Sequence, residues 1–116
     1  MNSVTSSLSA LRAFGTKMEV TANNVANANS REFKKSRADL TEGFGGDVEV
    51  EISRVDTPGA IVSEFSDGEM IDRELSNVQL EEEMTQMIMT QRCYEANLEA
   101  AKTKDEMLGT LVDIMS

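Results

Sequence analysis

The sequence predicts a mainly α-helical fold, in which an N-terminal and a C-terminal helix pair as a coiled coil around a small β-hairpin insert. Apolar side chains recur at alternating steps of four and three through the last third of the chain and again over the first 25 residues. Between them, a short stretch alternates apolar and acidic side chains. We divide the chain into an N-terminal helix (1–30), a loop or linker (31–46), a hairpin element (47–75) and a long C-terminal helix (76–116). The two helical segments form one helical domain.

The first helix is expected from residue 3 to about residue 28. Many Ser, Thr and Asn residues surround a narrow apolar stripe, and these are weak helix formers, so this helix needs a partner. Its Asn-rich end, residues 21–30, has two readings. It is either a helix C-terminus that frays into a turn, which local chemistry favours, or a polar network that fixes helix ends against neighbours. The stripe consists of Val4, Leu8, Leu11, Gly15, Met18, Ala22 and Val25.

The segment that follows carries charge and then glycine, which predicts a loop. The basic run from Arg31 to Arg37 is either a solvated loop or a segment that docks on an acidic stretch of a neighbouring copy. Residues 47–53 alternate as a half-buried strand does. We expect Pro58-Gly59 to turn the chain into a second strand over 60–65.

A second turn is expected at Asp67-Gly68, followed by a short third strand. The final helix is expected to start near Ser76 or Asn77, with Asn77 as its N-cap. Some 38 residues would run about 57 Å, too long for the rest of this chain to cover. Its end therefore projects into other molecules. Its expected seam is Leu80, Met84, Met87, Gln91, Tyr94, Leu98, Ala101, Asp105, Leu108, Val112 and Met115.

Charge and composition exclude several classes of function. Residues 1–40 carry six Lys/Arg and three Asp/Glu, a net of +3, and residues 41–116 carry five and 18, a net of −13, which sum to −10. Nucleic acid binding needs clustered cations, which are too few here. The chain has no His, no phosphate-binding glycine loop and no metal-ligand spacing, so we expect no enzyme, no catalytic residues, no cofactor and no metal.

Two further expectations concern the single cysteine and membranes. Cys93 stands alone, which excludes an intramolecular disulfide, and mid-helix it is expected to be a buried structural thiol. No apolar run reaches 18 residues, so we expect no membrane span. The start of the chain also lacks the features of a cleaved secretory signal.

Two sequence blocks at opposite ends resemble the flagellar basal-body rod and hook family of bacterial axial proteins. The first runs from Val20 to Asn29 and continues with Phe33-Lys34-Lys35. It resembles an ANNxAN signature that usually precedes a Gly-Phe-Lys/Arg run, although Glu32 stands where the glycine would be. The second block includes Ser76-Asn77-Val78 and continues from Gln91 through Asn97 to Leu111.

The resemblance implies a structural subunit of the flagellar rod. In this family the terminal helices line a hollow filament, and subunits pass through the type III export gate without signal cleavage and assemble in the periplasm. The expected partners are copies of the chain, other rod or hook proteins and the export gate. Phe14 and Met18 fit a loose pattern for an export signal, although Phe14 is equally well explained as a packing residue.

The short middle suggests a proximal-rod-like (FlgC-type) member, whereas the stretch from Gln91 to Leu111 is closer to the longer rod and hook branches. Gln91 and Asp105 interrupt the seam, either to fix its register or because they face water. The alternative function is a small acidic coiled-coil adaptor or export chaperone, which would need neither the Asn-rich block nor the hairpin. The family resemblance favours subunit contacts for Leu8, Leu11, Met18, Asn23, Asn24, Val25, Asn27, Met84, Met87, Gln91, Arg92, Tyr94, Asn97, Leu98, Leu108 and Leu111.

Overall fold

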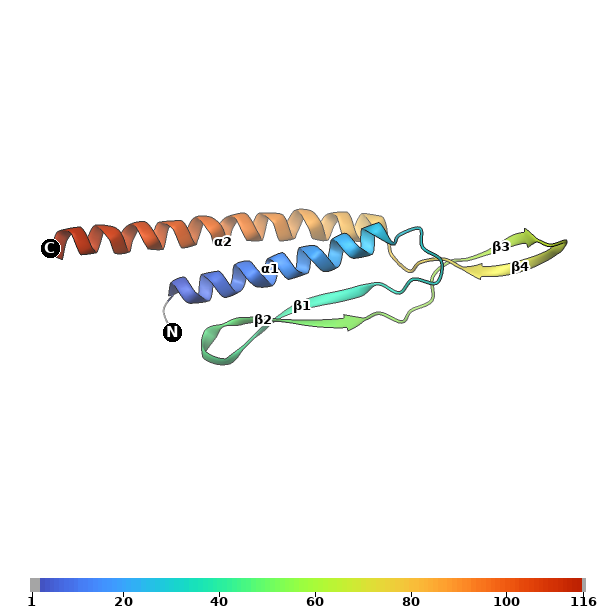
Figure 1. The fold of residues 1–116 in the computed structure, drawn as a ribbon, viewed down its shortest axis with the longest axis horizontal. Helices are drawn as coiled ribbons and strands as arrows, with labels where there is room; N and C mark the ends of the chain where they lie inside the picture. Colours follow the sequence, from blue (N-terminus) through green and yellow to red (C-terminus); the bar gives the residue numbers. More distant parts are fainter. Residues whose placement is uncertain (1–2, 116) are drawn as a thin grey trace.

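The protein is a narrow rod rather than a globule. The computed structural model describes residues 3–115, and the side chains of residues 5–115. Its extents are 83 × 24 × 17 Å and its radius of gyration is 20.8 Å, whereas a compact chain of this length would have a radius of about 13 Å. Figure 1 shows helices α1 (Ser3–Ala26) and α2 (Leu80–Met115) side by side, with two hairpins between them in the sequence. The predicted helical pair with a β insert is confirmed.

Helix α2 extends well beyond α1. At 1.5 Å per residue, the 36 residues of α2 span about 54 Å and the 24 residues of α1 about 36 Å. Near the start of α1, the Lys104 ammonium donates a hydrogen bond to the Ser7 hydroxyl (Nζ–Oγ 3.0 Å). The eleven residues that follow, 105–115, run past the N-terminal end of α1, and we call them the overhang (Figure 1).

The interior of the helical pair is built from small and polar side chains. Among the described side chains, the buried apolar residues are Ala10, Ala13 and Ala38. The buried polar ones are Ser7, Thr21, Asn24, Ser76, Asn77, Glu83 and Thr90. The apolar stripes expected to form the seam lie to the side of it, because Leu8 on α1 and Met84 on α2 are 51% and 53% exposed. Met87 and Ala101 are half-buried, so the expected and observed faces of α2 overlap only in part.

Much apolar surface is left uncovered as a result. The accessible surface is 8211 Å², whereas a compact monomer of this mass exposes about 6,200 Å². The excess of about 2,000 Å² is comparable with what subunits bury in permanent assemblies. The overhang contributes strongly, since Leu111, Val112 and Ile114 are 53%, 63% and 74% exposed.

The middle of the chain forms two separate antiparallel hairpins. Strand β1 (Ser36–Glu42) pairs with β2 (Val48–Arg54), and β3 (Ile61–Ser66) pairs with β4 (Glu69–Glu74). A short 3-10 turn, η1 (Phe44–Gly46), closes the first hairpin. The β1–β2 hairpin packs along α1, and the β3–β4 hairpin projects from the opposite end of the molecule to the overhang (Figure 1).

This pairing corrects two expectations. Residues 36–42 were expected within a loop, but they form β1. The alternation of this strand was missed because its inward side chains, Ala38 and Leu40, stand among charged residues in the sequence. Strand β3 does not return on β2, because Pro58-Gly59 links the two hairpins instead of closing one. A Cβ at Gly59 would collide with the Leu75 carbonyl oxygen, so the backbones pass closely there. The Asp67-Gly68 turn is confirmed, with φ of 50° and 83°.

Cys93 is exposed on α2, so the expectation of a buried thiol is wrong. Its place in the middle of the helix suggested burial, but the buried residues of α2, Glu83 and Thr90, lie on another side of the helix. No helix within residues 3–115 combines the length and apolar character needed to cross a bilayer.

Glu32 adopts the left-handed backbone conformation, with φ of 62°. An L-residue pays about 1–2 kcal/mol for this conformation, because its Cβ approaches the following carbonyl oxygen. This is the position at which the resembled family usually carries glycine, which adopts positive φ without that clash. The chain therefore carries local strain just before Phe33.

We predict that Glu32→Gly raises the free energy of unfolding by about 1 kcal/mol, because glycine relieves the backbone strain. Urea denaturation followed by circular dichroism measures the change. Glu32→Ala is the matched control, since it removes the same carboxylate but keeps a Cβ. Equal stability of the two variants would contradict the strain at this position.

Candidate functional site

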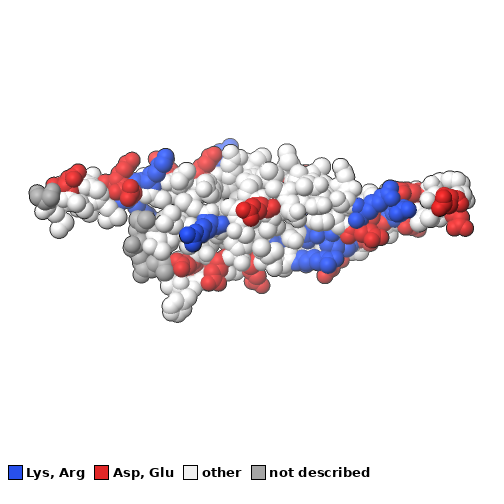
Figure 2. Space-filling view, viewed as in Figure 1, with Lys and Arg blue, Asp and Glu red and all other residues white. Residues whose placement is uncertain are grey.

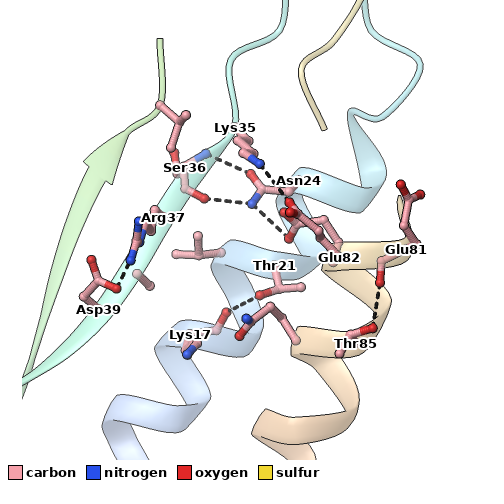
Figure 3. Close-up of a pocket in the computed structure, with 15 residues that line it drawn as sticks. Lys17, Thr21, Asn24, Lys35, Ser36, Arg37, Asp39, Glu81, Glu82 and Thr85 are labelled. Carbon is pink, nitrogen blue, oxygen red and sulfur yellow. Dashed lines mark hydrogen bonds and ion pairs between the residues drawn. The ribbon is translucent and has the colours of Figure 1, made fainter. Parts of the chain in front are cut away.

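The end of α1 is joined to the strands and to α2 at a polar site that we call the junction, formed by residues 24, 33–36, 55–59, 74–77 and 82–83. Its centre is Asn24, which is 2% exposed. The Asn24 amide donates to the Ser36 carbonyl (Nδ2–O 2.8 Å) and to the Glu83 carboxylate (Nδ2–Oε2 3.2 Å). Its side-chain oxygen accepts from the Ser36 N–H (3.0 Å). One side chain of α1 thus fixes the first residue of β1 and the first turn of α2 (Figure 3).

A second asparagine closes the other side of the junction. The Asn77 side-chain oxygen accepts from the Lys35 N–H (2.7 Å), and its amide donates to the carbonyls of Val55 (2.8 Å) and Thr57 (2.9 Å). The Asn77 N–H donates to the Phe33 carbonyl (3.2 Å). Asn77 therefore crosslinks three segments and is not the N-cap of α2, which begins three residues later. This corrects the expectation from the sequence, where a cap was the nearest explanation of an Asn before a helix.

The cations of the basic run all have acidic partners within the chain. Lys34 pairs with Glu74, Lys35 with Glu82 (Nζ–Oε2 3.2 Å) and Arg37 with Asp39 (Nε–Oδ1 3.1 Å). The fourth, Arg31, pairs with Glu64 (2.8 Å), which also pairs with Arg73 (3.0 Å). Figure 2 shows basic and acidic side chains side by side where the β3–β4 hairpin meets the body. These ion pairs show that the basic run helps to position the β3–β4 hairpin and α2 within the chain.

The pKa of Glu74 in this network is shifted. The Lys34 ammonium donates to its Oε1 and the Gly59 N–H donates to the same oxygen (3.0 Å). Both donors favour the charged carboxylate, so the pKa of Glu74 lies below its usual value of 4.5, with the Lys34 hydrogen bond as the main cause.

An open groove runs beside the junction, between α1, β1 and the start of α2. Lys17, Lys35 and Arg37 line it together with Asp39 and Glu81–Glu83 (Figure 3). Its charges are mixed and largely paired with each other. Within the described range, no group of His, Cys, Asp and Glu side chains has the arrangement of a metal site. The chemistry of this region is that of a structural joint, which holds four segments in fixed relative positions.

The residues predicted to contact other subunits fall into three groups. Asn24 is buried in the junction, where it contacts other segments of its own chain. Leu11, Met18, Val25, Asn27, Met87 and Asn97 are half-buried, as is Phe14 of the possible export signal. The exposed ones are Leu8, Asn23, Met84, Gln91, Arg92, Tyr94, Leu98, Leu108 and Leu111.

Sequence reasoning missed part of this site. Nothing in the local pattern marked Glu83 as different from Glu81 and Glu82, yet Glu83 alone is buried. Nothing in the sequence marked Ser36 either, because Asn24 binds its backbone N–H and carbonyl and not its side chain. Glu83 lies seven residues before Thr90 on the same side of α2, but the burial of Thr90 is itself visible only in the structure. The Asn-rich end shows the expected helix C-terminus, since α1 ends at Ala26 and passes into a turn over residues 27–29. Asn24 also joins a polar network, but its partners lie within the chain.

Both helical segments are similar to known protein families. The family described as "Flagella basal body rod protein" matches residues 5–34, and that described as "Flagellar basal body rod FlgEFG protein C-terminal" matches residues 73–114. Asn24 lies in the first match and Asn77 and Glu83 in the second. The Asn24–Glu83 hydrogen bond therefore joins the two matched segments.

Individual relatives are similar over shorter stretches. The flagellar hook protein FlgE of Escherichia coli K12 is 46% identical over 41 residues, which cover 35% of this chain and 10% of the hook protein. The flagellar basal-body rod protein FlgG of Borreliella burgdorferi is 56% identical over 36 residues, 31% of this chain and 14% of that protein. The chain thus spans a small part of the length of the relatives it matches.

We predict that Asn24→Ala lowers the free energy of unfolding by about 3 kcal/mol, since it leaves both backbone groups of Ser36 and the buried Glu83 carboxylate short of partners. Asn23→Ala, at the exposed neighbouring position, is the control and should change stability by less than about 0.5 kcal/mol. Chemical denaturation measures both. Similar losses of stability for the two variants would show that the hydrogen bonds of Asn24 do not hold the junction together.

The lowered pKa of Glu74 predicts a pH dependence of stability. A carboxylate whose pKa is lower in the folded state stabilises the fold above its unfolded pKa, and this contribution is lost as the pH falls through the folded pKa. Denaturation between pH 6 and pH 3 should therefore show a weaker loss of stability for Glu74→Gln than for the unchanged chain. Identical pH profiles would show that the Lys34–Glu74 pair contributes nothing.

Proposed function

We propose that the chain is an axial subunit of the flagellar basal-body rod family, which assembles with copies of itself and with other rod or hook subunits; both helical segments match models of that family. The single observation that carries this proposal is that large apolar side chains remain exposed although the junction holds the helices and strands in fixed positions. The junction holds the elements in place through polar contacts, whereas large apolar side chains of both helices remain exposed. A subunit that completes its packing on neighbours has this division.

The exposed apolar side chains lie where a neighbouring helix can reach them. Leu98 and Leu108 belong to the heptad stripe of α2, and their side chains are 39% and 52% exposed. Burial of such side chains contributes about 25 cal/mol per Å² of apolar surface. The total accessible surface exceeds that of a compact monomer by about 2,000 Å², which is an area of the size that stable subunit contacts bury.

We further propose that the chain reaches the periplasmic rod through the flagellar type III export gate, without cleavage of a signal. The support is the family resemblance and the pattern of Phe14 and Met18. Both side chains are half-buried in the folded chain. A gate would therefore read them in an unfolded chain, before α1 packs.

On subtype, the internal length favours a short, proximal-rod-like (FlgC-type) subunit. Only 53 residues, 27–79, separate α1 from α2, and the two hairpins occupy most of them. The FlgE and FlgG similarities support the longer branches instead. The geometry gives no support to the adaptor or export chaperone alternative. Such a protein would need neither the Asn-rich block nor the hairpins, whereas here both form part of the ordered structure.

We predict that the purified chain self-associates as its concentration rises, and that Leu98→Asp and Leu108→Asp each weaken the association at least about tenfold, because each buries a charge in an apolar contact. Sedimentation velocity measures the association. Thr110→Asp, which adds the same charge at an exposed polar position, is the control. In a motile bacterium that depends on this chain, the two Leu variants should abolish swimming but not export. A monomer at all concentrations, or full activity of both Leu variants, would overturn the proposal.

A further inference from the structure

The β3–β4 hairpin, which we call the arm (residues 61–74), is held firmly at its base but uncovered along one face. The Leu75 N–H donates to the Ala60 carbonyl (2.8 Å) and the Glu32 N–H to the Glu74 carbonyl (3.1 Å). The Arg31–Glu64–Arg73 ion pairs add side-chain contacts to the same region. The direction of the arm is thus fixed before any partner binds, which lowers the entropy cost of docking.

One face of the arm is apolar and exposed. Phe65 lies directly across from Met70, and their side chains share a face with that of Ile61. The three are 73%, 65% and 66% exposed. An isolated two-stranded hairpin is marginally stable in water, so this face is the part of the arm that needs cover. The same face carries Asp72, which accepts a hydrogen bond from the Ser63 hydroxyl (2.7 Å) and forms no ion pair among the described residues.

The complementary surface lies on α2. Met84, Ile88 and Met89 are 53%, 55% and 56% exposed. Arg92, one turn after Ile88, is exposed and has no ion-pair partner within residues 5–115. At 100° per residue, Ile88 and Arg92 lie on the side of α2 opposite to the buried Glu83 and Thr90. We call the exposed residues Met84, Ile88, Met89 and Arg92 the patch, and none of them is buried against α1.

The patch cannot receive the arm of its own chain. The arm and α2 leave the junction in opposite directions (Figure 1). Arg92 lies twelve residues into α2, about 18 Å from its start and on the side away from the arm. Only a second molecule can bring an arm to the patch.

We propose that the arm of one copy docks on the α2 patch of a second copy, with Phe65 and Met70 against Met84 and Ile88, and Asp72 beside Arg92. This rests on the proposed function and names the contact through which identical subunits meet. Charge complementarity supports this pairing, since Arg92 is the one charged residue of the patch. Copies with a net charge of −10 repel each other, so they associate best where a local cation meets a local acid.

Other pairings of the same surfaces lack that complementarity. Two arms facing each other would place Asp72 against Asp72. The overhang is apolar, but residues 105–115 carry Asp105, Glu106 and Asp113 and no Lys or Arg. An arm on an overhang would therefore bring together surfaces of the same sign. Because the two partners use different surfaces, the contact repeats from copy to copy without closing.

Charge reversal on the full chain tests the proposal. Asp72→Arg and Arg92→Asp should each weaken self-association by about tenfold in sedimentation velocity, because each brings like charges together. An equimolar mixture of the two variants should associate as the unchanged chain does, since every arm then finds a patch of opposite charge. Glu69→Arg, on the other face of the arm, and Lys102→Asp, elsewhere on α2, are the matched controls. Circular dichroism of each variant checks that it is folded.

The outcomes separate this contact from the general function. If the unchanged chain associates but the mixture remains as weak as either variant alone, the arm-to-patch contact is wrong while the proposed function stands. Stronger association of Asp72→Arg alone would indicate that the arm meets an acidic surface, such as the overhang, and would also overturn it. A strictly monomeric unchanged chain would overturn both proposals.

Discussion

The bidentate contact between the Asn24 side chain and the Ser36 backbone is the interaction on which the rest of the structure depends. Asn24 offers one donor and one acceptor to a single residue, as a neighbouring strand would, and its remaining N–H reaches Glu83. Without a large apolar core, the relative positions of α1, β1 and α2 have to be fixed by directional bonds. Buried polar groups that are fully paired do this well, since any other arrangement would leave them without partners.

This choice of a polar interior has a consequence for the surface. Small and polar side chains along the seam allow α1 and α2 to lie together while using little of the apolar area of either helix. The stripes that a self-sufficient coiled coil would bury stay exposed beside the seam. A chain with this arrangement has a defined shape as a monomer and leaves apolar surface available to neighbouring subunits, in agreement with the proposed assembly.

The sequence predicted the architecture better than the contacts. Heptad spacing located both helices, and the Asp67-Gly68 turn was found because its chemistry is local. The pairing of strands was missed because β1 hides two inward residues among charged ones, and because Pro58-Gly59 reads as a turn within a hairpin as readily as a link between two. The helical seam was placed on the most apolar stripe, as it would be in an isolated coiled coil. Here that stripe and the observed seam diverge, because small and polar side chains form the seam and the large apolar ones lie beside it. Asn77 was taken for a cap because its real partners, at Lys35, Val55 and Thr57, are 20 or more residues away.

Hydrogen exchange of the backbone amides, measured on the full chain at low and at high concentration, tests most directly the division between a fixed polar frame and open apolar faces. The amides of Lys35 and Ser36, bonded to Asn77 and Asn24, should be protected at both concentrations. Those of the overhang should exchange quickly in the dilute chain and become protected only when copies associate. Strong protection of the overhang in the dilute monomer, or rapid exchange at Lys35 and Ser36, would contradict the account.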